Sequence, residues 1–183
     1  MQITDMTIPE VKLLTPRRFR DERGFLCETY RRQTFHDVGV KEDFQQDNLS
    51  FSASQGTIRG LHFQIPPVAQ AKLVFVLRGA ILDVAVDVRI NAPSYGQYVA
   101  QRLDDQQGEQ LFIPCGFAHG FVTLEPNTLV YYKISSPYSP EHERGVAWDD
   151  PDLGIPWGIP EEDAYLSDRD KRHPRLRDIE PYF

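Results

Sequence analysis

Cysteine is nearly absent from this chain of 183 residues, which contains only Cys27 and Cys115. Their spacing matches no metal-binding motif, so we expect two free thiols. The chain also has no apolar run long enough to cross a membrane, and it does not open with a basic, apolar leader. These absences predict a cytoplasmic protein.

Motifs for common cofactors and nucleophiles are missing as well. The sequence contains no GxGxxG, no P-loop and no GxSxG, which leaves dehydrogenase, NTPase and serine hydrolase functions without support. Positive charge is not in excess either: 20 Lys and Arg face 27 Asp and Glu, a net charge of −7. This balance argues against a general nucleic-acid binder. It remains compatible with an anionic small molecule, because a few local arginines suffice to bind phosphate.

What is present is a globular composition cut into short segments. Hydrophobic residues make up 40% and charged residues 26%, and 12 glycines and 14 prolines are spread along the chain. We expect a single domain over residues 1–183. The runs rich in β-branched and aromatic residues predict strands at 72–77, 81–89, 98–103, 110–113, 121–124 and 128–134. A meander of such strands predicts an all-β protein, a cupin or jelly-roll β-barrel.

Alternation is cleanest at 81–89, where Leu82, Val84, Val86 and Val88 point one way and the intervening residues the other. Helices are few and short. One is expected at 31–38, ended by Gly39. A second is expected to start at Ser167–Asp170, which has the form of a capping box, and to end before Pro174.

Several residues could carry chemistry, although each has a plain structural explanation when taken alone. His62, within Arg59-Gly-Leu-His-Phe-Gln64, could be an ordinary strand histidine, and Lys72 could extend along a strand end to solvent. The segment 114–121, which contains His119, could be a tight turn. Tyr132 could be a core aromatic and Asp170 a helix cap.

A metal site is not expected. Metal-binding cupins show two histidines one residue apart, followed by a carboxylate and a later histidine. Here Gln64 stands two residues after His62, with His119 further along, so the ligand set is incomplete.

Taken together and in order, these segments resemble the dTDP-4-dehydrorhamnose 3,5-epimerase family. The resemblance covers nearly the whole chain. It runs through 21–25 (DERGF), 46–48 (QDN), 59–64 (RGLHFQ), 72–74 (KLV), 83–89 (DVAVDVR), 116–121 (GFAHGF), 132–133 (YK) and 166–170 (LSDRD).

The resemblance implies catalytic roles for six residues. His62 resembles the general base held by Asp170, Lys72 the cation that stabilises an enolate oxygen, and Tyr132 the acid on the opposite face. His119, supported by Asp83, would help to hold the sugar. Further substrate contacts are implied at Arg23, Phe25, Glu28, Gln46, Asp47, Asn48, Arg59, Tyr138, Glu143 and Arg169.

The resemblance also implies an enzyme without a cofactor that acts on a dTDP-4-keto-6-deoxyhexose as a homodimer. N-terminal strands would reach the neighbouring subunit, so residues near Arg23 could act in the partner's site. Alternatives stay open: an epimerase of C3 or C5 alone, a sugar-nucleotide 3,4-ketoisomerase, a sugar-binding cupin without activity, and a metal cupin.

Overall fold

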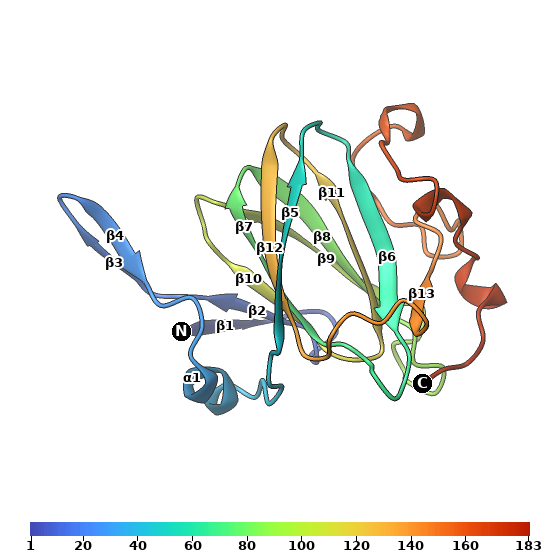
Figure 1. Cartoon of the computed structure of the whole chain (residues 1–183), viewed down its shortest axis with the longest axis horizontal. Coiled ribbons are helices and arrows are strands. Elements are labelled where there is room, and N and C mark those ends of the chain that lie inside the picture. Colours follow the sequence, from blue (N-terminus) through green and yellow to red (C-terminus); the bar gives the residue numbers. More distant parts are fainter.

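The computed structural model describes all 183 residues as two facing antiparallel sheets and a projecting hairpin (Figure 1). The larger sheet contains, in spatial order, β1 (Gln2–Asp5), β2 (Lys12–Thr15), β10 (Gln110–Ile113), β7 (Lys72–Arg78), β12 (Thr128–Ile134) and β5 (Gln46–Ser52). The smaller contains β13 (Glu143–Gly145), β6 (Ile58–Gln64), β11 (Phe117–Thr123), β8 (Ala80–Asp87) and β9 (Tyr98–Asp104). The hairpin is β3 (Arg18–Asp21) with β4 (Gly24–Cys27).

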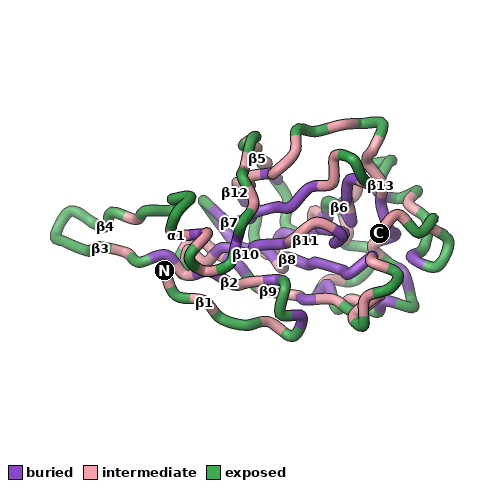
Figure 2. The backbone as a smooth tube through the Cα atoms, turned by 90° about the horizontal axis from the view of Figure 1, so that it is seen from below, coloured by how far each residue is buried: buried purple, intermediate pink, exposed green.

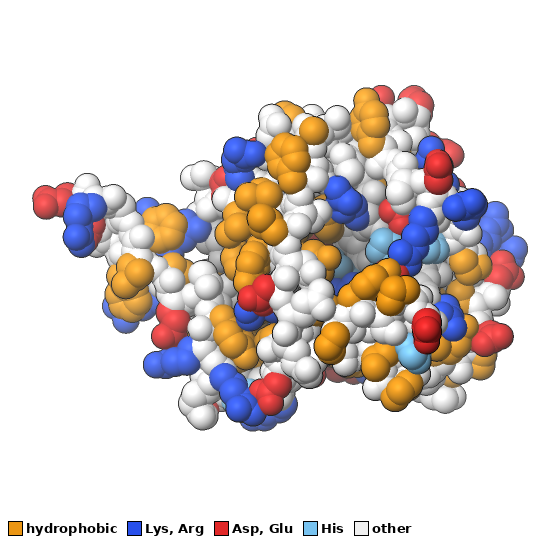
Figure 3. All heavy atoms as spheres, in the orientation of Figure 1, with side chains coloured by type: hydrophobic (Ala, Val, Ile, Leu, Met, Phe, Trp, Pro, Cys, Tyr) orange, Lys and Arg blue, Asp and Glu red, His pale blue; other side chains and the backbone are white.

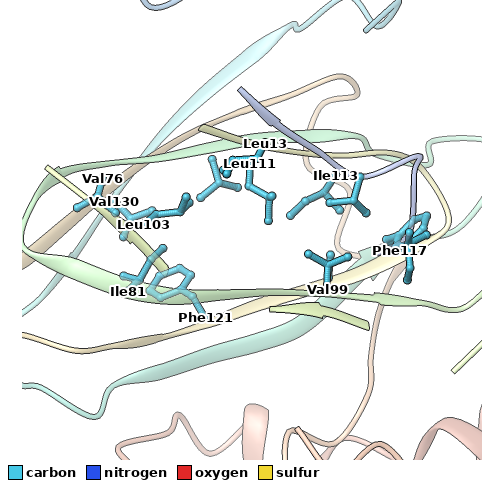
Figure 4. Packing of buried hydrophobic residues seen from close by; sticks show 14 residues of the cluster. Leu13, Val76, Ile81, Val99, Leu103, Leu111, Ile113, Phe117, Phe121 and Val130 are labelled. Atoms are coloured by element: carbon cyan, nitrogen blue, oxygen red, sulfur yellow. The ribbon is translucent and has the colours of Figure 1, made fainter. Parts of the chain in front are cut away.

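Consecutive strands repeatedly change sheet, as β7 and β8 do, which closes the two layers into the jelly-roll barrel that the sequence predicts. The main core lies between the sheets (Figure 4). Val76 and Val130 from the larger sheet face Ile81, Leu103 and Phe121 from the smaller one, and all are buried. These side chains fill one part of the barrel and leave the other part to polar residues.

Two further clusters cover the outer faces of the sheets. The α1 helix (Arg32–Asp37) buries Phe35 against the larger sheet, beside Leu73. The C-terminal segment buries Trp157 and Leu176 against Val86 and other residues of the smaller sheet. This segment contains three 3₁₀ turns, at Glu161–Asp163, Asp170–Arg172 and Leu176–Asp178. Figure 2 shows the buried residues running through the centre, with the β3–β4 hairpin exposed. No helix in the structure is of a length and apolarity that would cross a membrane.

The alternation expected at 81–89 is confirmed. Val84 and Val86 pack in the outer cluster, while Ile81 and Ala85 pack between the sheets. Both faces of β8 are covered, so residues on either face are buried. One of those that point between the sheets is a carboxylate, Asp83.

Two segments need comment. The turn that the sequence left open for 114–121 is not present at residues 117–121, which form part of strand β11. The small residues Ala118 and Gly120 let β11 lie between β6 and β8, and a Cβ on Gly120 would be 2.7 Å from the carbonyl oxygen of Arg59. The short helix expected between Ser167 and Pro174 is a single 3₁₀ turn, Asp170–Arg172. The expected helix at 31–38 is present as α1.

Candidate active site

Polar side chains take over the inward-facing positions at one end of the barrel. Lys72 precedes the core residues Val74 and Val76 on the same face of β7, and Tyr132 follows Val130 on β12. On the opposite sheet, His119 lies between the core residues Phe117 and Phe121 on β11, and His62 pairs with it in the neighbouring strand β6. Strand periodicity therefore brings together residues that are far apart in the sequence.

These residues line two adjoining cavities of about 260 and 360 Å³, which share His62, Lys72 and Tyr132. The first cavity is completed by Ser50, Arg59, His119, Phe121, Ser167, Arg169 and Asp170, and the second by Gln46, Asn48, Gln70, Ile134, Tyr138 and Glu143. Figure 3 shows histidine atoms inside a hollow on this face, with Lys and Arg atoms beside it.

His62 is held by a carboxylate from the C-terminal segment. Its Nε2 lies 2.6 Å from Oδ1 of Asp170, while no protein hydrogen bond reaches its Nδ1. The backbone N–H of Asp170 in turn donates to the Ser167 hydroxyl (3.1 Å). Burial lowers the pKa of His62 and outweighs the opposing effect of Asp170, so the imidazole is neutral near pH 7. Burial alone would raise the pKa of Asp170, but the imidazoles of His173 and His62 hold it well below its usual range.

Lys72 and Tyr132 are shaped by burial. The ammonium of Lys72 donates to the carbonyl oxygen of His62 (3.3 Å), and burial lowers the pKa of this lysine to about 8. Burial raises the pKa of Tyr132, which keeps its phenol protonated. The cavity thus holds a neutral base (His62), a cation that loses its proton near pH 8 (Lys72) and a weak acid (Tyr132).

A second histidine–carboxylate pair lies deeper in the barrel. His119 Nε2 is 2.7 Å from Asp83 Oδ1, and both side chains are nearly inaccessible, at 7% and 0% exposure. The other oxygen of Asp83 is buried without a partner.

Charged residues surround the cavity mouth. Arg169 pairs with Glu143, and the hydroxyl of Tyr138 donates to the same glutamate (2.6 Å). Burial alone would raise the pKa of Glu143, but these two partners lower it, so the carboxylate is ionised. Arg59 donates to the Ser52 hydroxyl (3.3 Å), which fixes its guanidinium at the edge of the first cavity.

Most of the expected site residues are brought together, and four are not. Gln46 and Asn48 line the second cavity and share a hydrogen bond of 2.9 Å. Asp47, on the other face of β5, pairs with Lys133 and lines neither cavity. Arg23 and Phe25 lie on the β3–β4 hairpin, which projects from the barrel (Figure 1), and Glu28 follows it. None of the three lines either cavity.

Sequence reasoning missed His173, which packs beside the His62–Asp170 pair. Its ring lies edge-on to that of His62, with centroids 5.3 Å apart. Its position three residues after Asp170 was the available signal, because one 3₁₀ turn returns the chain to the same side. Gln70 and Ser50 were also missed, and no motif marked them.

Comparison with known proteins identifies the family. Residues 5–178 match the family model described as dTDP-4-dehydrorhamnose 3,5-epimerase. A protein of that name from Sinorhizobium fredii is 48% identical over 180 residues, which cover 98% of this chain and 91% of the relative.

Two solved structures are closely similar. The Bacillus anthracis 3,5-epimerase, with TDP and PPi bound, is 45% identical with a TM-score of 0.92, covering 95% of this chain and 98% of that one. An epimerase from Legionella pneumophila in complex with dTDP-4-keto-L-rhamnose is 38% identical with a TM-score of 0.93, covering 98% and 94%. The chain belongs to the dTDP-4-dehydrorhamnose 3,5-epimerase family.

Proposed function

We propose that this chain inverts C3 and C5 of dTDP-4-keto-6-deoxy-D-glucose through enolate intermediates, as a dTDP-4-dehydrorhamnose 3,5-epimerase. The observation that carries the proposal is the His62–Asp170 pair, which shares one cavity with Lys72 and Tyr132. Its family relatives carry the same name.

The reaction requires a base next to a carbon whose proton is made acidic by the neighbouring carbonyl. In a 4-keto sugar, the C3–H and C5–H bonds both lie next to the carbonyl, so removal of either proton gives an enolate. His62 suits this role because burial keeps it neutral. Asp170 fixes the tautomer with the proton on Nε2, which leaves Nδ1 to accept the proton, and it stabilises the imidazolium that forms.

The negative charge that develops on the ketone oxygen needs a cation. Lys72 is buried in the barrel wall, where the low dielectric strengthens its attraction for an oxyanion far beyond its value in water. We assign it to that oxygen.

Inversion requires that the proton return from the other side of the ring. Tyr132 projects from the larger sheet, whereas His62 projects from the smaller one, so the two line the cavity from opposite walls. We assign Tyr132 as the proton donor. His119, held by Asp83, would bind the sugar between them.

The diphosphate and the nucleoside extend beyond the cavity. Arg59 and Arg169 would make charge-assisted hydrogen bonds to phosphate oxygens. We propose that the thymine end meets Arg23, Phe25 and Glu28 from a second copy, because these residues lie on an arm that projects from its own barrel. The working enzyme would then be a homodimer, and we place it in the cytoplasm.

Solvent exchange tests the activity directly. The purified protein, in EDTA, is incubated with dTDP-4-keto-6-deoxy-D-glucose in D₂O and followed by NMR and mass spectrometry. Deuterium at both C3 and C5 of an inverted product supports the proposal. Deuterium at one carbon alone would indicate a single epimerase, a moved carbonyl a ketoisomerase, and no exchange would reject an epimerase acting on this sugar.

The two opposed roles are separated by a pair of variants. His62→Ala should abolish exchange at both carbons, because no base remains. Tyr132→Phe should still exchange protons on the His62 side but fail to invert at least one carbon. Unchanged turnover in both variants would reject the assigned roles.

A further inference from the structure

His173 is a histidine that the proposed reaction does not use, yet it lies against the catalytic pair. Its Nε2 is buried, has no hydrogen-bond partner and is 3.4 Å from Oδ1 of Asp170. The same oxygen accepts the 2.6 Å contact from His62. A glycine makes the position possible, because a Cβ on Gly145 would lie only 2.3 Å from the His173 ring. His173 Nε2 therefore faces a carboxylate oxygen that His62 already engages.

The three side chains offer ligand atoms for a small cation. One ligand atom from each of the three residues lies within 4.8 Å of the other two, and Oδ1 of Asp170 is 2.6 Å from Nε2 of His62 and 3.4 Å from Nε2 of His173. Zn²⁺ is bound by imidazole nitrogen and carboxylate oxygen at about 2.0–2.2 Å, which in a tetrahedral shell separates the ligand atoms by about 3.3 Å. The two observed nitrogen–oxygen separations, 2.6 and 3.4 Å, differ from this value by less than an ångström. Two histidines and one carboxylate would leave a fourth position open.

Charges of both signs lie near the three side chains. Asp170 places a carboxylate between the two imidazoles. Three cations line the same cavity: Arg59, Arg169, which is paired with Glu143, and Lys72, whose ammonium donates to the carbonyl oxygen of His62.

We propose that His62, Asp170 and His173 form an inhibitory Zn²⁺ site built around the catalytic base. A metal on Nε2 of His62 displaces the proton that Asp170 holds there, and the neutral ring then carries its proton on Nδ1. That nitrogen is the one left for the substrate, so the bound metal removes the base. Binding follows from the geometry alone, whereas inhibition rests on the proposed function.

Binding is tested without substrate. Protein treated with EDTA and dialysed is titrated with Co²⁺, whose visible absorption reports its coordination, and with Zn²⁺ by calorimetry. One equivalent should bind to the wild type, with affinity at least about tenfold weaker in His173→Gln, which loses a ligand. His173→Cys should bind again, because a thiolate is also a Zn²⁺ ligand.

His36→Gln is the matched control. His36 also has a buried Nε2 without a partner and lies near a carboxylate, 3.9 Å from Asp43, but no third ligand is present. It should bind metal as the wild type does. Equal affinity in the wild type and His173→Gln, or a loss in His36→Gln instead, would overturn the proposed site.

Inhibition is measured as C3 and C5 proton exchange in buffered free Zn²⁺, relative to the rate of each variant in EDTA. The wild type should lose activity in parallel with metal occupancy and regain it with EDTA, while His173→Gln keeps most of its rate at the same free Zn²⁺. Full activity at full occupancy would overturn the inhibitory role. A protein inactive even in EDTA would contradict the proposed function, and the Co²⁺ titration would still decide the site.

Discussion

The two histidine–carboxylate pairs of the cavity differ mainly in exposure. His62 is 24% exposed, whereas His119 is 7% exposed and its partner Asp83 is fully buried. A group that exchanges protons with substrate and solvent must be reachable, while a group that holds the sugar from below can be buried. The difference supports His62 as the base and His119 as a positioning group.

A bell-shaped pH profile is expected for kcat/KM. Activity should rise with pH as His62 loses its proton, with the acid limb below pH 6.5 because burial lowers the pKa of this residue. It should fall above about pH 8, where Lys72 loses the charge that stabilises the enolate. Lys72→Arg should move the alkaline limb upward, since a guanidinium stays protonated. An alkaline limb unmoved in Lys72→Arg would assign it to another group.

Asp170→Asn should reduce kcat by roughly 10²–10⁴-fold, the range of general acid–base contributions. The amide keeps the shape but can neither stabilise the imidazolium nor fix the same tautomer. Asp168→Asn, an exposed neighbour in the same segment, is the control and should keep wild-type kinetics. If kcat fell by similar factors in both variants, the cause would be a disturbed C-terminal segment and not the loss of the Asp170 carboxylate.

At the level of elements, periodicity predicted the central strands well and the flanking ones poorly. Strands β7, β8, β9, β10 and β12 were expected to within about two residues, because their β-branched residues alternate. The strands β1 to β6 lack that density. Two glycines near His119 left a turn open as an alternative. Gly120 instead allows close backbone approach between strands, and Gly116, just before β11, has φ +85° and lies against the Arg89 side chain.

The contact between β6 and β11 gives a stability prediction. Gly60 has φ +115°, and a Cβ there would lie 2.5 Å from the carbonyl oxygen of His119. Gly158 also has positive φ (+76°) but open space around it. Gly60→Ala should therefore lose about 1–3 kcal/mol more free energy of unfolding than Gly158→Ala, because its φ lies further from the left-handed region and its Cβ also meets backbone. Urea denaturation measures the difference, and equal losses would contradict the close approach.

On the scale of the whole molecule, sequence patterns could not place distant segments. No local sequence pattern predicts that Asp170 contacts His62 or that His173 lies beside them. Both contacts depend on how the C-terminal segment crosses the outer face of the smaller sheet. The resemblance supplied the first pairing, and only the structure supplied the second. The residues of the hairpin were expected at the substrate, yet within one chain they lie away from the cavity.

Subunit mixing tests whether the hairpin acts in the partner's site. Phe25 and Leu26 on the hairpin are 52% and 75% exposed, as an arm that binds a second copy would be in isolation. Arg23→Glu and His62→Ala should each be nearly inactive. If the hairpin acts in trans, unfolding and refolding them together should restore about a quarter of the wild-type activity, since random pairing leaves one complete site in half of the dimers. His62→Ala mixed with Lys72→Ala should restore none, and no recovery in the first mixture would place the hairpin in its own site.

The position of Asp170 in the chain has a consequence for biosynthesis. All strands of the barrel, through β13 at Gly145, leave the ribosome before the segment that carries this carboxylate. A nascent chain can therefore form its pocket while the base still lacks its partner. Catalytic competence should arrive late and abruptly, with the docking of the segment around Asp170, so that a polypeptide interrupted during translation would hold a shaped pocket without an activated base.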